Sequence, residues 1–374
     1  MLRSPVRLVV LVAVITAAGC SVAPDTAPGE QTRRDTSGGA DRAALAGRAA
    51  HTMTALPNGD LLVAGGCDTD GCAAATNSAF LLSGTSLDEV DDLAQARDSH
   101  TAVALPGGRV LVAGGFAGEG RPPLASAEVF DPVTGTWDTT GSLREGRGGH
   151  AAALLGDGRV LVAGGWVGPS TYTSTTEIYD PVTGDFTAGP RLPVAADGLA
   201  ATPLGDGCVL VVGGQSRSQV ATDRAVTVCP DGSLREVGSL QTARFKHGAT
   251  ALDSGEVLVV GGTPDDEALL TSTELYDPRT RRFRPGPELL AGRYKLTDAV
   301  ATLPDGRVAV AGGGNGVELI DIGAGITTDV DALGRRTRSF STVGVTDGQL
   351  VVVGGYDESI RLTHTYLTLP VTDL

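Results

Sequence analysis

Short runs of apolar residues, each followed by two glycines, recur along the chain. The clearest examples are Arg109-Val-Leu-Val-Ala-Gly-Gly115 and Arg159-Val-Leu-Val-Ala-Gly-Gly165. A short apolar run without polar alternation is typical of a β-strand covered on both faces. The glycine pairs lie at 65–66, 114–115, 164–165, 213–214, 261–262, 312–313 and 354–355. This spacing of roughly 50 residues, shorter only at the end, predicts seven repeats of one structural unit.

Each full repeat divides into two predicted hairpins. The first is formed by apolar strands around a tight turn, as in 100–115, and the second by strands around an Asp-Pro-x-Thr-Gly turn, as in 127–137. Gly, Pro and Asp at these places are the residues that tight turns favour. Each repeat therefore predicts four antiparallel strands.

These segments resemble kelch repeats in the double glycine, in the Tyr-Asp-Pro at 179–181 and 276–278, and in the spaced Trp137. The resemblance covers roughly residues 47 to 369. It implies an all-β fold, a seven-bladed β-propeller of four-stranded antiparallel blades over residues 45–374, similar to the central domain of galactose oxidase. Two repeats depart from the Tyr-Asp-Pro pattern, with Phe80-Leu-Leu-Ser83 and Leu319-Ile-Asp-Ile322 in its place.

The last repeat is incomplete. It predicts strands near 340–345 and 349–353 and a third within 360–369, but no fourth strand follows. An open blade leaves unpaired strand edges, which closed propellers avoid. We therefore expect residues 40–47 to supply the missing outer strand.

The amino-terminal segment, residues 1–19, has the pattern of an export signal. Arg3 and Arg7 precede a short apolar run that ends at Ala17-Ala18-Gly19-Cys20, which resembles the lipobox of bacterial lipoproteins. We expect lipid attachment at Cys20 and an exported protein anchored to the cell membrane or outer membrane; the alternative is a plain secretory signal. Residues 20–44 are polar and rich in Pro, Gly and Ser, and they predict a flexible tether.

The chain is acidic, with a formal net charge of −15. Phosphate binding needs clustered Lys and Arg, so nucleic acid is excluded as the expected partner. Ser-His-Asp, nucleotide-binding and dinucleotide-binding motifs are absent, and we expect no cofactor and no resident metal.

Four cysteines remain besides Cys20, and an even number in an exported protein predicts disulfides. Cys67 and Cys72 share one short loop. Superposing the repeats puts Cys208 where other repeats have Arg109, Arg159 or Arg307, and puts Cys229 where they have Asp131, Asp180 or Asp321. These places lie opposite each other on neighbouring strands, so we expect Cys67–Cys72 and Cys208–Cys229 bonds. A metal site is the rival, but these cysteines share no ligand spacing.

Candidate binding residues gather at one repeat position. An Arg-x-x-His pattern occurs at Arg48/His51, Arg97/His100, Arg147/His150 and Arg244/His247, with Lys295 in the sixth repeat. Because this position opens the innermost strand, these residues are expected to ring one mouth of the channel. One reading is a basic mouth that holds carboxylate or sulfate groups, with Trp166 and Tyr172 stacking on a sugar or partner. The other is a structural role between blades, with Trp166 capping its own blade.

The chain therefore predicts a non-catalytic binding or scaffold module for an envelope or extracellular protein or a glycan. Variable loops such as 116–125 and 166–175 share the face of the mouth, where binding is usual. The alternative is a sugar-directed enzyme of the galactose-oxidase or sialic-acid-mutarotase kind. The first needs a Cys–Tyr crosslink and a further carboxy-terminal domain, a pattern this sequence does not match, and no acid–base pair stands out for the second.

Overall fold

The computed structural model describes residues 45–374 apart from 46, 85, 217–219 and 331–337. The chain divides into two units, Met1–Ser37 and Gly38–Leu374, and every described residue belongs to the second. The predicted signal, Cys20 and the predicted tether lie outside the described residues. Among the described residues, no helix has the length and apolar character needed to cross a membrane.

The described part of the second unit contains seven blade sheets in chain order and one two-stranded sheet, which confirms the predicted all-β propeller. Blade 1 is β1 (Thr52–Ala55), β2 (Leu61–Ala64), β3 (Ala79–Ser83) and β4 (Ser86–Glu89). Blade 2 is β5 (Thr101–Ala104), β6 (Val110–Ala113), β7 (Ala127–Asp131) and β8 (Thr136–Thr139). Blade 3 is β9 (Ala151–Leu154), β10 (Val160–Ala163), β13 (Thr176–Asp180) and β14 (Asp185–Ala188), with a small hairpin of β11 (Trp166–Gly168) and β12 (Thr171–Tyr172).

The remaining blades repeat this plan. Blade 4 is β15 (Ala200–Pro203), β16 (Val209–Val212), β17 (Ala225–Val228) and β18 (Leu234–Glu236). Blade 5 is β19 (Gly248–Ala251), β20 (Val257–Val260), β21 (Thr273–Asp277) and β22 (Arg282–Pro285). Blade 6 is β23 (Val300–Thr302), β24 (Val308–Val310), β25 (Val317–Asp321) and β26 (Ile326–Val330), and blade 7 is β27 (Thr342–Thr346), β28 (Gln349–Val353) and β29 (Tyr366–Pro370).

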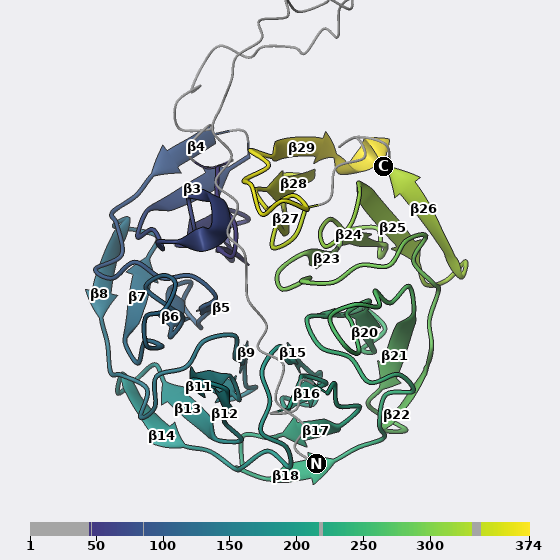
Figure 1. The fold of residues 1–374 in the computed structure, drawn as a ribbon, viewed down its shortest axis with the longest axis horizontal. Helices are drawn as coiled ribbons and strands as arrows, with labels where there is room; N and C mark the ends of the chain where they lie inside the picture. The colour runs from purple at the N-terminus through teal and green to yellow at the C-terminus, as the bar shows by residue number, and fades with distance from the viewer. Residues whose placement is uncertain (1–44, 46, 85, 217–219, 331–337) are drawn as a thin grey trace, which may run out of the picture. The chain divides into compact units, whose positions relative to one another are not determined.

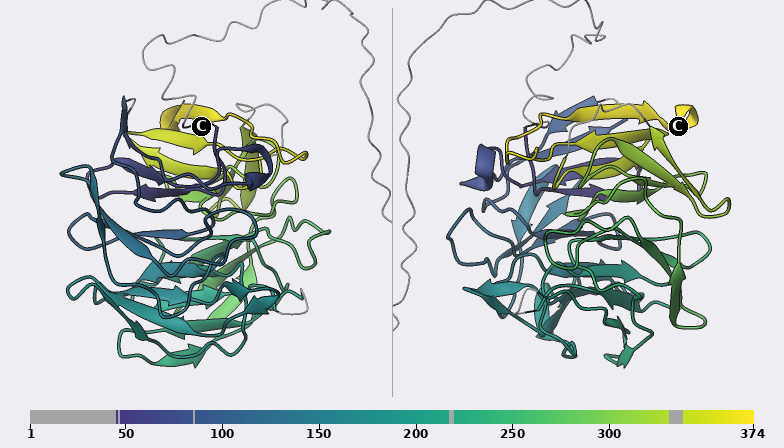
Figure 2. Two further views of the ribbon diagram at one scale, coloured as in Figure 1. Left: turned by 60° about the vertical axis from the view of Figure 1, so that its left-hand side comes forward. Right: turned by 45° about the vertical axis from the view of Figure 1, so that its right-hand side comes forward.

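The innermost strands form a closed circle. Each of β1, β5, β9, β15, β19, β23 and β27 contacts the next, and β27 returns to β1. Figure 1 looks down this circle, with the outer strands β4, β8, β14, β18, β22 and β26 along its rim. Figure 2 shows the short 3-10 helix η1 (Asp70–Cys72) at one of the two faces of the ring.

The second strand of each blade explains the apolar runs in the sequence. All four residues of β6 (Val110–Ala113) are buried, because neighbouring blades cover both faces of the strand. Seven hydrophobic clusters result, one at each boundary between blades. The fourth strands are mostly exposed, as β8 (Thr136–Thr139) illustrates. Burial therefore decreases from the inner strands to the rim.

Glycine pairs join successive blades. Gly115 donates its N–H to the carbonyl oxygen of Arg147 in the next blade at 2.8 Å, and all seven boundaries have an equivalent bond of 2.6–2.9 Å. Gly114 has a φ of 65°, and a Cβ there would lie 2.5 Å from that same oxygen. A side chain at this place would be both strained and obstructed, which explains why the pair recurs.

Blade 7 has three strands within the described residues. Residues 40–44 and 46 of the predicted closing strand lie outside the description. Leu45 is fully buried in the cluster between blades 7 and 1, beside Leu82 and Val353. The segment before His51 thus contributes to the core where the ring closes.

Both expected disulfides are confirmed. Cys67 bonds Cys72, and Cys208 bonds Cys229 with their Cα atoms 4.1 Å apart. The register agrees, since Val209 pairs with Val228. The arginines at the place of Cys208 in other blades do not pair across the strands with the Asp at the place of Cys229: Arg159 and Arg307 pair with Asp157 and Asp305 inside their own turns at 2.6 Å. A turn carboxylate two residues away is the nearer partner for these arginines.

Candidate functional site at the mouth of the channel

A cavity of about 1010 Å³ opens at one mouth of the channel. Its floor comes from the residues that precede the innermost strands, and its wall comes from the loops at 116–123 and 166–169. These loops follow the glycine pairs of blades 2 and 3, as the sequence predicted for the variable face. The size is in the range of small-ligand sites.

The arginines of the Arg-x-x-His pattern point into the blades. Arg147 is fully buried; it donates to the carbonyl oxygens of Gly164 and Thr175 at 3.0 Å and pairs with Glu177 at 2.7 Å. Arg97 and Arg244 do the same with Glu128 and Glu274, at 2.7 and 2.9 Å. None of these three arginines borders the cavity. Their contacts are structural, but they lie within one blade and not between blades as the structural reading had it.

The sixth blade corrects one assignment. Arg293, not Lys295, holds the equivalent place, since it bonds the carbonyl oxygen of Gly312 at 3.0 Å and pairs with Glu318 at 2.9 Å. The histidine place is occupied there by Leu296, whose side chain faces Gly261 as His100 faces Gly65. In the seventh blade Ser341 takes that place. Arg293 lies 19 residues before Gly312, whereas the arginines of blades 2, 3 and 5 lie 17 residues before the first glycine of their pair, and this difference displaced the alignment.

The histidines connect blades. Nε2 of His51, His100 and His150 lies 2.7–3.0 Å from the hydroxyl of Thr342, Thr52 and Thr101 in the preceding blade. Burial, with a neighbouring arginine, lowers the pKa of His150 and His247 to about 3 and that of His51 and His100 well below the ordinary value. All four are neutral at pH 7. Of the two readings, a basic mouth disagrees with these contacts, because Arg97, Arg147 and Arg244 are paired within the blades and the histidines are uncharged.

A ring of left-handed residues surrounds the mouth. One residue per blade has a φ between 50° and 62°: Ala50, Ser99, Gly149, Gly198, Lys246, Lys295 and Phe340. Ala50 donates its N–H to the carbonyl oxygen of Phe340, and each following member as far as Lys246 donates in the same way to its counterpart in the preceding blade, at 3.0–3.2 Å. Leu296 continues the series onto Lys246. Left-handed conformations in residues other than glycine are uncommon, and this series of bonds holds six of the seven residues, Lys295 being the exception.

Phe116 and Trp166 form the aromatic wall of the cavity. Their ring centroids lie 5.3 Å apart in an edge-on arrangement, and both side chains are partly exposed. Backbone bridges anchor them, Phe116 to Asp98 and Trp166 to Gly148. Gly148 is required, since a Cβ there would lie 2.2 Å from the Phe116 ring. Tyr172 pairs with Trp166 across the β11–β12 hairpin but does not border the cavity.

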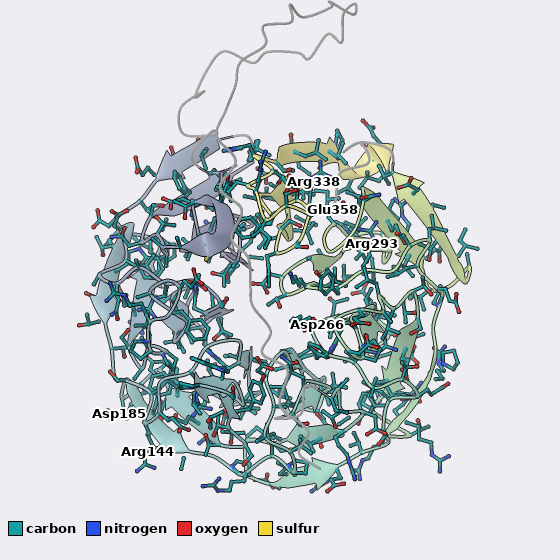
Figure 3. The ribbon with its side chains drawn as sticks, in the orientation of Figure 1. Arg144, Asp185, Asp266, Arg293, Arg338 and Glu358 are labelled. Carbon is teal, nitrogen blue, oxygen red and sulfur yellow. A yellow bond between two sulfur atoms is a disulfide. The ribbon has the colours of Figure 1, made fainter. Side chains whose placement is uncertain are left out.

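Carboxylates give the mouth its charge. Asp98 and Asp197 border the cavity, and burial raises the pKa of each from 3.8 to about 6. Asp298 is exposed to the solvent of the channel, yet the surrounding protein desolvates it and raises its pKa to about 7. Lys246 also borders the cavity and is paired with Asp266 at 2.6 Å. Figure 3 shows Asp266 on the inner side of the ring.

The structure thus brings His100, His150 and Trp166 to the cavity, whereas Arg97, Arg147, Arg244, His247 and Tyr172 lie outside its wall. Sequence reasoning missed Asp98, Asp197, Asp298 and Phe116. Asp98 and Asp197 occupy one repeat position, directly before the left-handed ring, where the other blades have different residues. The sequence did contain a signal for this site: two blades have an aspartate at a repeat position where no one residue type recurs.

Within the described residues, one group could place three potential metal ligands together: Cys67, Cys72 and Asp98. The two sulfur atoms are joined in a disulfide and are not thiolates. This group therefore does not fit a metal centre.

Comparison with known proteins agrees with the fold. The Kelch motif family matches residues 99–144 and 147–193, which hold blades 2 and 3. A solved structure titled "Structure of YjhT" is similar, with a TM-score of 0.57 and 14% identity, covering 75% of this chain and 96% of that one. No curated protein matches the chain. The seven blades identify the fold as a β-propeller, and two of its blades match the Kelch motif.

Proposed function

We propose that this propeller is an exported, non-catalytic binding module that holds a glycan in the cavity at the channel mouth. The cavity carries the proposal: about 1010 Å³ of space is lined by the aromatic pair Phe116 and Trp166 and by the carboxylates of Asp98 and Asp197. Aromatic faces cover the apolar face of a sugar ring, and carboxylates accept hydrogen bonds from hydroxyl groups. A protein partner on the same face is the alternative.

Export and anchoring support the same role. Two disulfides are typical of a protein outside the reducing cytosol. Lipid on Cys20 would hold the chain at the envelope, and the polar segment 20–44 would give it reach. Labelled palmitate is expected to be incorporated by the wild-type chain and not by Cys20→Ser. A wild-type chain without label would end the anchoring proposal.

Glycan binding is tested by an array of envelope and extracellular glycans probed with the full chain and with Trp166→Ala. We expect a restricted set of bound glycans and at least a tenfold loss in the variant, because stacking area is removed from the wall. Tyr172→Ala is the matched control, since Tyr172 lies next to Trp166 but outside the cavity. An array without bound glycans, or equal binding by both variants, would contradict the proposal.

One observation favours the enzymatic alternative. Asp298 borders the cavity with a pKa of about 7, which suits a group that moves protons at neutral pH. Incubation with anomeric sugars, and with oxidisable sugars with and without copper, tests this. Turnover that disappears in Asp298→Asn would replace the binding module with a sugar-directed enzyme.

A further inference from the structure

We propose that the glycan held at the channel mouth carries a protonated amine, as an amino sugar does. This inference rests on the glycan-binding function proposed above and adds the charge of the ligand. It follows from the carboxylates of the cavity, which outnumber the cations that border it.

Asp98 is the first of these groups. It borders the cavity although only 6% of its surface is exposed, and a hydrogen bond from Ser99 offsets only part of the cost of its burial. The described residues include no Lys, Arg or His nitrogen within ion-pair distance of it. A carboxylate that is nearly buried and lacks a counter-ion destabilises the fold, and a bound cation would relieve that cost.

Asp197 repeats the arrangement two blades further round. Its Oδ1 atom is buried and has no hydrogen-bond partner in the described part of the chain. The positive charge of Lys246 acts on Asp197 and lowers its pKa, but the amine of Lys246 already pairs with Asp266 at 2.6 Å. One lysine therefore stands between two carboxylates, and this side of the cavity is also short of positive charge.

The whole cavity has the same imbalance. Its acidic residues are Asp98, Glu119, Asp197 and Asp298, and its cations are Lys246 and the exposed Arg121. The bordering histidines are neutral because their pKa values are lowered. An anionic sugar would add to this excess of negative charge, whereas a sugar ammonium group would be attracted by the carboxylates and by the aromatic faces of Phe116 and Trp166.

The test uses two matched probes with the full chain at pH 7.5: a β-1,4-linked glucosamine trisaccharide and its N-acetylated counterpart. We expect calorimetry to show at least tenfold tighter binding of the amine. Asp98→Asn and Asp197→Asn are each expected to reduce amine binding about tenfold and to weaken binding of the N-acetylated sugar less than threefold, because asparagine keeps an oxygen that accepts hydrogen bonds from sugar hydroxyls. Asp185→Asn is the control, since Asp185 lies at the outer edge of the ring in Figure 3.

The outcomes separate the two proposals. Equal or tighter binding of the N-acetylated trisaccharide would overturn the amine and leave the glycan site standing. Binding of neither trisaccharide would overturn the amino-sugar inference, while the array alone would then decide the glycan site. Spermidine serves as a third probe. If spermidine binds as tightly as the glucosamine trisaccharide, the site recognises an amine alone and the proposal of an amino sugar is overturned. Thermal melting of each variant establishes that it is folded.

Discussion

The hydroxyl of Thr101 lies 2.8 Å from Nε2 of His150, across the boundary between blades 2 and 3. Thr52 and Thr342 repeat this relationship with His100 and His51. His247 is the exception: the first residue of the preceding inner strand is Ala200, and both ring nitrogens of His247 are buried without a partner among the described residues.

Ala200→Thr is therefore expected to stabilise the fold by about 1 kcal/mol, because it supplies the missing hydroxyl. Urea unfolding monitored by Trp fluorescence measures the change in the free energy of unfolding. Ala151→Thr is the matched control, since the facing residue there is Leu199 and the added hydroxyl gains no such partner. Equal effects of the two substitutions would contradict the assigned bond.

The buried pair of Arg147 and Glu177 gives a second prediction. Glu177 accepts from the guanidinium at 2.7 Å and from the backbone N–H of Arg144 at 2.8 Å. Glu177→Ala leaves a buried cation unpaired, and we expect a loss of about 3–5 kcal/mol in the free energy of unfolding. Glu236→Ala removes the partner of the exposed Arg224 and is expected to cost less than about 1 kcal/mol. A loss at Glu177 as small as that at Glu236 would be inconsistent with the structural role of these arginines.

A third prediction concerns pH. The pKa of Asp98 is about 6 in the folded state, above its ordinary 3.8, so the folded chain binds the proton more tightly than the unfolded chain does. This contribution to stability is fully present below pH 3.8 and is lost as pH rises through 6, by on the order of 3 kcal/mol. Asp98→Asn should therefore be more stable than the wild type at pH 8, and this advantage should shrink towards pH 4. A difference in Tm that does not change with pH would rule this out.

Closure of the ring gives a fourth prediction. Leu45 is fully buried between blades 7 and 1, so Leu45→Ala is expected to cost about 2–5 kcal/mol by leaving a cavity. Leu290→Ala is the control because Leu290 is 60% exposed. Truncation of residues 1–47 should lower Tm at least as much, since it removes Leu45 together with the predicted closing strand. An unchanged Tm after truncation would dismiss that strand.

The sequence allowed the blades, their order and their register to be predicted, because the glycine pairs and apolar runs are local signals. The same register led from Cys208 to Cys229. The sequence did not predict that the arginine side chains point into the blades, since their glutamate partners lie on the third strand of the sheet. A signal was present, because a glutamate stands directly before two large hydrophobic or aromatic residues in the third strand of four blades: Glu128, Glu177, Glu274 and Glu318. The sequence predicted which face of the propeller binds a ligand but not the cavity itself, because Asp98 and Phe116 occupy positions whose residues differ from blade to blade.

The ring of left-handed residues has a consequence for how this surface could change. From Phe340 round to Lys246, its backbone N–H and C=O groups bond to one another, so the scaffold at the mouth does not depend on which side chains it presents. Ala50, Ser99, Gly149, Gly198, Lys246, Lys295 and Phe340 already span small, polar, cationic and aromatic side chains in one backbone conformation. These seven positions therefore accept different side chains without a change of backbone conformation. Exchanging residues among them, with Gly and Asn as the least strained choices, should alter ligand selectivity without rebuilding the propeller.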